Sequence, residues 1–192
     1  MSNSLNYRYL KLQALLLLLL GRRHSALTRF DRMLVDWPDD PYALASRAHV
    51  LAQEGDRLNA IGVLQQLTAR HPEHIAAWFN LAYLLEDIGR YAEAEAAFRR
   101  TLDLDPRMDR AWYGLALVLI RERRLDEAVQ TLKKNTELQP MSPFGWYQLA
   151  RVHVDRQDPD AALKIIRHLK RFEPKVANQL ERETGLSVAR CS

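Results

Sequence analysis

The residues that could bind a metal or catalyse a reaction are few and scattered along the chain. The segment HPEH brings His71, Glu73 and His74 together, and imidazole and carboxylate groups are common ligands of transition metals. The same segment is typical of a solvated loop between two helices. We favour this interpretation because no H-E-x-x-H motif or paired C-x-x-C accompanies it. No metal site is therefore expected.

Other catalytic patterns are missing from the sequence. The chain has one cysteine, Cys191, and neither a G-x-S-x-G nucleophile elbow nor a glycine-rich phosphate loop. Carboxylates such as Asp103 and Asp105 lie near a predicted helix end, where ordinary surface placement accounts for them. We therefore expect a protein that is not an enzyme and that needs no cofactor.

The charge pattern does not favour a nucleic-acid partner. The chain carries 28 Lys and Arg against 24 Asp and Glu, a formal net charge of +4, with the two signs interleaved. Basic clusters at 22–24, 121–124 and 164–171 do not form a continuous stripe with interleaved aromatic residues. The content of 47% apolar and 27% charged residues is typical of a soluble globular protein, and the single cysteine fits a reducing compartment. We expect a bacterial cytoplasmic protein, with a periplasmic one as the alternative if the first helix is cleaved.

A repeat of 34 residues is the strongest signal in the sequence. Prolines, tryptophans and alanines each recur at this interval, and the columns share one register. The members are Pro38, Pro72, Pro106, Pro140 and Pro174; Trp78, Trp112 and Trp146; Ala14, Ala48, Ala82, Ala116 and Ala150; and Ala26, Ala60, Ala94, Ala128 and Ala162. A third small column holds Gly21, Gly55 and Gly89, and is continued by Arg123 and Gln157.

Each 34-residue unit is expected to fold as two helices. The first helix of unit 75–108 has a core-facing stripe, spaced at i, i+3, i+4 and i+7, made of Trp78, Leu81, Ala82 and Leu85. Gly89 supplies the left-handed residue that commonly follows a helix end. The second helix ends before Pro106, because proline lacks an N–H group and disfavours helical geometry in the preceding residue. Its inward stripe is Tyr91, Ala94, Phe98 and Leu102.

These residues resemble the pattern of the tetratricopeptide repeat (TPR) family. The family's order of large apolar, Leu-Ala, bulky, Gly, Ala, Phe and Pro positions is matched by Trp78, Leu81, Ala82, Leu85, Gly89, Ala94, Phe98 and Pro106. The resemblance covers five units, 7–40, 41–74, 75–108, 109–142 and 143–176. It implies an all-α fold, a right-handed solenoid of five helix-turn-helix repeats. A capping helix at 177–185 and a disordered tail at 186–192 complete the expected organisation.

The segment QALLLLLLGRR, residues 13–23, raises the question of a membrane anchor. Its apolar run from Ala14 to Leu20 is seven residues long, whereas a bilayer span needs about 20. Gly21 and Arg22 stand where a signal-peptide cleavage site would lie. In the 34-residue register the run is the first helix of the first repeat, and membrane contact is not expected. Because the helix is apolar all round, we expect a second interface, for a homodimer or a larger assembly, at Leu15, Leu16, Leu18 and Leu19.

The resemblance also implies a concave surface, lined by the first helices of successive repeats, along which a partner peptide lies. Residues offset by one from the core stripe face this surface, and Phe79, Tyr113 and Tyr147 form an aromatic column. The flanking groove residues are Tyr42, His49, Asn80, Tyr83, Arg110, Phe144 and Arg151. The alternative is that these rings pack between neighbouring first helices.

The predicted function is a non-catalytic scaffold or adaptor that binds a protein or peptide partner in this groove. Some TPR proteins hold the acidic tail of a chaperone with five clamp residues, but only Asn80 and Arg110 match here, while Ala45, His49 and Gly114 occupy the other places. A chaperone for secreted or membrane-complex subunits and a regulatory subunit of a multi-protein enzyme are the alternatives.

Overall fold

The computed structural model describes residues 2–187 of the chain. These residues form eleven α-helices and no strand, in two compact units, Met1–Arg90 and Tyr91–Ser192. The first unit contains α1 (Ser2–Leu19), α2 (Arg23–Asp36), α3 (Pro41–Gln53), α4 (Arg57–Arg70) and α5 (Ile75–Asp87). The second contains α6 (Tyr91–Leu104), α7 (Asp109–Arg121), α8 (Leu125–Leu138), α9 (Pro143–Asp155), α10 (Pro159–Leu169) and α11 (Pro174–Thr184).

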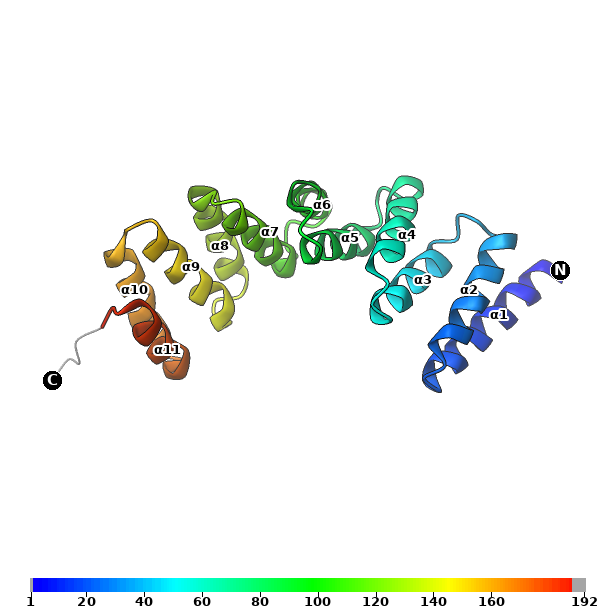
Figure 1. The fold of residues 1–192 in the computed structure, drawn as a ribbon, viewed down its shortest axis with the longest axis horizontal. Helices are drawn as coiled ribbons and strands as arrows, with labels where there is room; N and C mark the ends of the chain where they lie inside the picture. The colour runs from blue at the N-terminus through cyan, green and yellow to red at the C-terminus, as the bar shows by residue number, and fades with distance from the viewer. Residues whose placement is uncertain (1, 188–192) are drawn as a thin grey trace. The chain divides into compact units, whose positions relative to one another are not determined.

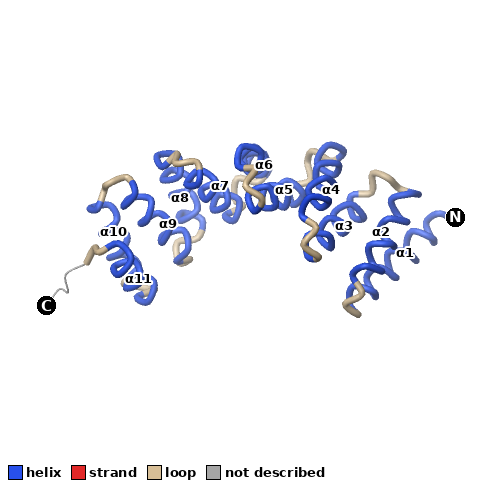
Figure 2. The backbone as a smooth tube through the Cα atoms, in the orientation of Figure 1, coloured by secondary structure: helices blue, strands red, loops and turns tan. Residues whose placement is uncertain are grey.

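Within each unit, helices that follow one another along the chain pack side by side (Figure 1). Short loops join them (Figure 2), which makes neighbouring helices antiparallel. The two alanine columns lie at the packed faces, where their small side chains allow a close approach. Ala14, Ala26, Ala48 and Ala60 are buried in the first unit, and Ala94, Ala116, Ala128, Ala150 and Ala162 in the second. The expected all-α repeat fold is confirmed.

The turn inside each helical hairpin requires one left-handed residue. Gly21, Gly55 and Gly89 have φ angles of +71°, +84° and +78°, as the glycine column predicts. Arg123 and Gln157 hold the same conformation, with φ of 62° and 60°. The turn therefore persists in the second unit without glycine, at a cost in backbone strain.

The tryptophan side chains of the repeat bind the loops by hydrogen bonds and are not part of the buried core. Trp78 is only half-buried, so its expected place in the core stripe is wrong, whereas Leu81 and Leu85 of the same stripe are buried. Each indole N–H donates to the carbonyl of the proline six residues earlier, at distances of 3.0, 2.9 and 2.8 Å. The pairs are Trp78–Pro72, Trp112–Pro106 and Trp146–Pro140. This bond explains why the proline and tryptophan columns keep a fixed spacing.

The two histidines of the HPEH segment make structural hydrogen bonds. His74 is the N-cap of α5, where its Nδ1 accepts a hydrogen bond from the Ala77 N–H at 3.1 Å. His71 Nε2 lies 2.7 Å from the carbonyl oxygen of Asp39. Across residues 2–187 no group of three or more His, Cys, Asp or Glu side chains is arranged to hold a metal ion.

The first and last helices differ in detail from expectation. α11 begins at Pro174, three residues before the predicted cap at 177–185, and buries Ala177 and Leu180. Of the tail expected at 186–192, residues 188–192 lie outside the described part of the chain. Of the four leucines expected to form a second interface, Leu18 packs partly buried against the core, whereas Leu15, Leu16 and Leu19 are exposed. No described helix is long and apolar enough to cross a bilayer.

Candidate peptide-binding surface

The predicted groove residues all project from the first helices of repeats. α3 carries two of them, α5 three, α7 two and α9 three. Six are exposed: His49, Asn80, Tyr83, Arg110, Phe144 and Arg151. The other four, Tyr42, Phe79, Tyr113 and Tyr147, are half-buried rings. The aromatic column is divided between the units, with Phe79 in the first and Tyr113 and Tyr147 in the second.

The first unit contains a cleft of about 350 Å³ between α3, α4 and α5. It brings together three predicted groove residues, His49, Asn80 and Tyr83. Apolar side chains from all three helices also line it: Ala48, Ala52, Leu64 and Leu84. This mixture of apolar lining and a few polar groups is typical of ligand clefts. A cleft with this lining can accommodate one side chain of a partner protein and form hydrogen bonds with the partner's backbone.

An ion pair forms part of the lining of the cleft. Arg57, at the first position of α4, bonds through Nε to Asp87, the last residue of α5. Both residues line the cleft, so their charges are matched locally, and Gln53, His49 and Asn80 are its other polar groups. The sequence pattern does not predict Arg57 and Asp87 as lining residues, because they lie 30 residues apart and Arg57 belongs to a second helix.

Tyr42 does not line this cleft. Its ring lies beneath the Lys11 ammonium, with Nζ 3.8 Å from the ring centroid, and it meets Phe30 edge-on with centroids 6.3 Å apart. These contacts fix Tyr42 among α1, α2 and α3. The alternative interpretation, that groove rings pack between helices, is therefore correct at this position.

In the second unit, the surface of α9 is shared with α11. The Tyr147 hydroxyl donates a hydrogen bond of 2.5 Å to Oε2 of Glu183. This bond raises the pKa of Tyr147 and lowers the pKa of Glu183, because it stabilises the protonated phenol and the ionised carboxylate. Arg151 lies over the same ring, with Cζ 5.8 Å from the centroid. The sequence pattern does not predict a role for Glu183, because it predicts only the packing of the capping helix.

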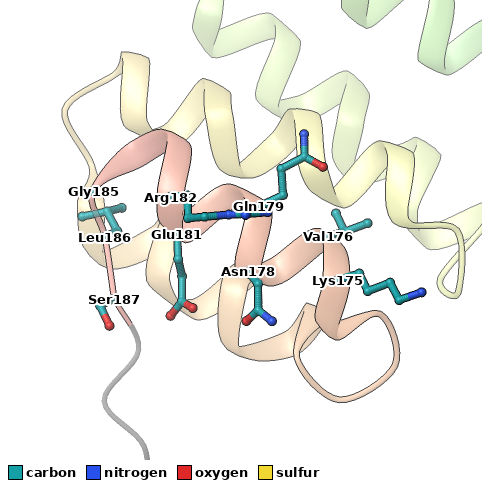
Figure 3. Close-up of a pocket in the computed structure, with 9 residues that line it drawn as sticks. All are labelled: Lys175, Val176, Asn178, Gln179, Glu181, Arg182, Gly185, Leu186 and Ser187. Atoms are coloured by element: carbon teal, nitrogen blue, oxygen red, sulfur yellow. The ribbon is translucent and has the colours of Figure 1, made fainter.

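Two further hollows involve α11. One, of about 340 Å³, is lined by Arg151, Val154, Asp155, Glu183 and Thr184. The other, of about 770 Å³, lies over α11 and the residues that follow it, between 175 and 187. Its side chains come from α11 and the segment just after it, and they fan outward instead of converging (Figure 3). We therefore place the candidate binding surface on the first helices and not on this hollow.

Comparison with known families decides the class of the protein. A tetratricopeptide repeat model matches residues 46–108 and 87–143, and a second model of that family matches residues 143–168. The chain belongs to the tetratricopeptide repeat family. TPR proteins bind protein or peptide partners and are generally non-catalytic scaffolds.

Solved structures share the fold at low sequence identity. A MamA crystal structure has a TM-score of 0.84 at 17% identity, covering 96% of this chain and 98% of its own. MamA from Desulfovibrio magneticus RS-1, from residue 41 to its end, has a TM-score of 0.79 at 21% identity and covers 94% and 98%. YrrB, described as a TPR protein with an unusual peptide-binding site, has a TM-score of 0.78 at 18% identity and covers 88% of each chain. No curated protein matched the sequence.

Proposed function

We propose that this TPR protein is an adaptor that binds a segment of a partner protein on its first helices. The cleft of the first unit carries the proposal. Its aromatic side chain, Tyr83, is 59% exposed and stands beside an apolar lining. Tyrosine is among the residues that most often anchor protein interfaces. The binding site described for YrrB, a structural relative, is also one for a peptide.

The chemistry of the cleft favours an extended segment with a medium-sized apolar side chain. Ala48, Ala52 and Leu84 would contact that side chain. Asn80 carries both a donor and an acceptor, so it can bond a peptide N–H and C=O together. His49, exposed on α3, can bond a second peptide group. Because Arg57 and Asp87 neutralise each other, we do not expect the bound residue to be charged.

The second unit offers a different set of contacts on α7 and α9. Phe144 is 69% exposed and supplies another apolar anchor. Arg110 and Arg151 are exposed and would orient polar groups of the partner, while Tyr147 is already bonded to Glu183. The Tyr147 hydroxyl can donate to a ligand only if that bond is broken, whereas its oxygen can still accept a hydrogen bond. We assign to this unit the polar part of recognition.

A chaperone role or a regulatory-subunit role would use the same surface, and the identity of the bound partner separates them. The cytoplasm is the proposed compartment, because the chain has a single cysteine. We assign no part of the groove to the exposed leucines of α1, which form a separate surface.

Site-specific photocrosslinking tests the proposal. A photoreactive phenylalanine analogue is placed at Tyr83 in one variant and at Leu58 of α4, which is 71% exposed, in a matched control. Both proteins are irradiated in lysate of the source organism. We expect a protein adduct specific to position 83, identified by mass spectrometry, with the crosslinked peptide mapped to one segment of the partner. Equal adducts at both positions, or none at 83, would refute the groove assignment.

A further inference from the structure

The exposed face of α1 carries a regular row of large apolar side chains. Leu5, Tyr9, Leu12, Leu16 and Leu19 are each more than half exposed, and their spacing alternates between four and three residues. We call this row the α1 seam. A spacing that averages 3.5 residues is the one that lets two helices interlock along their length. The seam therefore has the pattern of a helix-pairing surface, although nothing in residues 2–187 covers it.

Later repeats show what normally covers two of the five seam positions, those of Tyr9 and Leu16. Translation of Tyr9 and Leu16 by 34 residues gives Ala43 and Val50 of α3, which are buried where α2 packs on that helix. The same positions in the second unit are Ala111 and Val118 beneath α6, and Gly145 and Val152 beneath α8. In each case a preceding antiparallel helix lies on this face. On α1 no helix among residues 2–187 lies on this face.

We propose that α1 of a second copy of the chain covers the α1 seam, in an antiparallel pair about a two-fold axis at Leu12. In this register Leu5 faces Leu19 of the second copy, and Leu12 faces its own equivalent. Tyr9 and Leu16 lie between them. The axis places Tyr9 at the level of position 15 and Leu16 at the level of position 8, so these two side chains approach each other one residue out of step. The row is therefore self-complementary, as an isologous dimer interface requires.

Charge on α1 favours this pairing over a parallel one. The helix contains no Asp or Glu, and Arg8 is its exposed cation. A parallel pair would place the two Arg8 side chains at the same level. In the antiparallel pair eight residues separate their levels, about 12 Å at the rise of an α-helix. Lys11 is withdrawn from the seam, since its ammonium lies over the Tyr42 ring.

The area available is sufficient for a weak, specific dimer. Seven large apolar side chains of residues 5–20 are exposed, the five of the seam together with Leu15 and Leu20. At about 30 Å² per methylene-sized group, their exposed parts amount to about 500 Å² per copy. A pair would bury about 1,000 Å², the lower bound for a specific interface. We therefore expect dissociation in the micromolar range.

Sedimentation velocity across a concentration series from about 1 to about 100 μM, spanning micromolar affinity, is the first test. The wild-type chain should pass from monomer to dimer, whereas Leu12→Glu should remain a monomer because two carboxylates would meet on the axis. Leu58→Glu is the matched control, since Leu58 is 71% exposed and Leu12 69%. It should dimerise like wild type. A wild-type chain that stays monomeric, or a dimer that survives Leu12→Glu, would overturn the proposal.

Cysteine crosslinking tests the register independently of affinity. In a Cys191→Ser background, Leu12→Cys should form a disulfide-linked dimer by itself under mild oxidation. Leu5→Cys and Leu19→Cys should crosslink with each other when mixed, and neither should crosslink alone. Self-crosslinking at position 5 would contradict the antiparallel pair. Flotation of the chain with lipid vesicles, or capture of a different helical protein on the seam in place of the second copy, would overturn the assignment.

Discussion

Two glycines in the first unit allow a direct test of the left-handed backbone conformation in the hairpin turn. Gly55 follows α3 with a φ of +84°, whereas Gly62 lies inside α4 with helical geometry. A Cβ atom added at either position would meet no atom within 4 Å. Substitution by alanine therefore changes neither packing nor contacts. Any difference between Gly55→Ala and Gly62→Ala must come from the backbone conformation.

The two substitutions should have opposite signs. A Cβ in the left-handed region costs about 1–2 kcal/mol, and the gain from a stiffer unfolded chain offsets about 0.4–1 kcal/mol of it. Gly55→Ala should then lower the free energy of unfolding by about 0.5–1 kcal/mol. Gly62→Ala should raise it by about 0.5–1 kcal/mol, the usual gain over glycine inside a helix. For a chain of this size each kcal/mol shifts Tm by about 2–4 °C.

Urea denaturation followed by far-UV circular dichroism measures both effects. The midpoint should fall for Gly55→Ala and rise for Gly62→Ala, with unchanged slopes, because neither substitution alters the surface exposed on unfolding. Midpoints that move in the same direction, or a Gly55→Ala protein as stable as wild type, would refute the assignment of a strained left-handed turn. The whole difference between the two variants should be about 1–2 kcal/mol.

Three further predictions concern the second unit. Gln157→Gly should raise the free energy of unfolding by about 0.5–1 kcal/mol in urea melts, because φ at this position is 60°; an unchanged midpoint would contradict the strain. Gly114→Ala should lower it by about 1–3 kcal/mol, since its Cβ would lie 2.3 Å from Cζ of the buried Phe98; a neutral result would mean that the ring moves freely. Burial lowers the pKa of His153, so the unfolded chain binds the proton more readily and stability should fall as pH drops from 7 through about 6.5. Urea melts of His153→Leu should lack that dependence, and a wild-type chain that is equally stable at pH 7 and 5.5 would contradict it.

Much of the fold follows from the sequence, because its determinants are local and repeated. The glycine column predicts left-handed turns, and the structure has them at Gly21, Gly55 and Gly89. At Arg123 and Gln157 only the place in the 34-residue register predicts the same conformation, since neither residue type favours it. For a related reason, the apolar stripe wrongly predicts that the tryptophans are buried in the core. Apolar character predicts burial, but the indole N–H finds a carbonyl six residues earlier and holds Trp78 half-exposed.

The sequence predicts which face of each helix carries the candidate surface, but it predicts less of the contacts that the side chains on that face make. Periodicity places Tyr83 and Asn80 on an accessible side of α5, and the cleft of the first unit includes both. The bond between Tyr147 and Glu183 joins residues 36 positions apart and depends on how α11 packs on α9. Likewise, a run of six leucines does not predict which side of α1 is buried, because every side of that stretch is apolar. Only the neighbouring helices decide that Leu18 packs against the core while Leu19 faces outward.

A quantitative pull-down from lysate with exposure-matched variants tests the central claim, that the first helices bind a partner. The groove variant Tyr83→Ser with Phe144→Ser removes side chains that are 59% and 69% exposed, and the control variant Leu58→Ser with Val35→Ser removes side chains from second helices that are 71% and 68% exposed. Equal helicity by circular dichroism is established first. The account predicts a partner retained by the wild type and the control and reduced on the order of tenfold or more with the groove variant, as the loss of interface anchors requires. Equal recovery with all three proteins would contradict it.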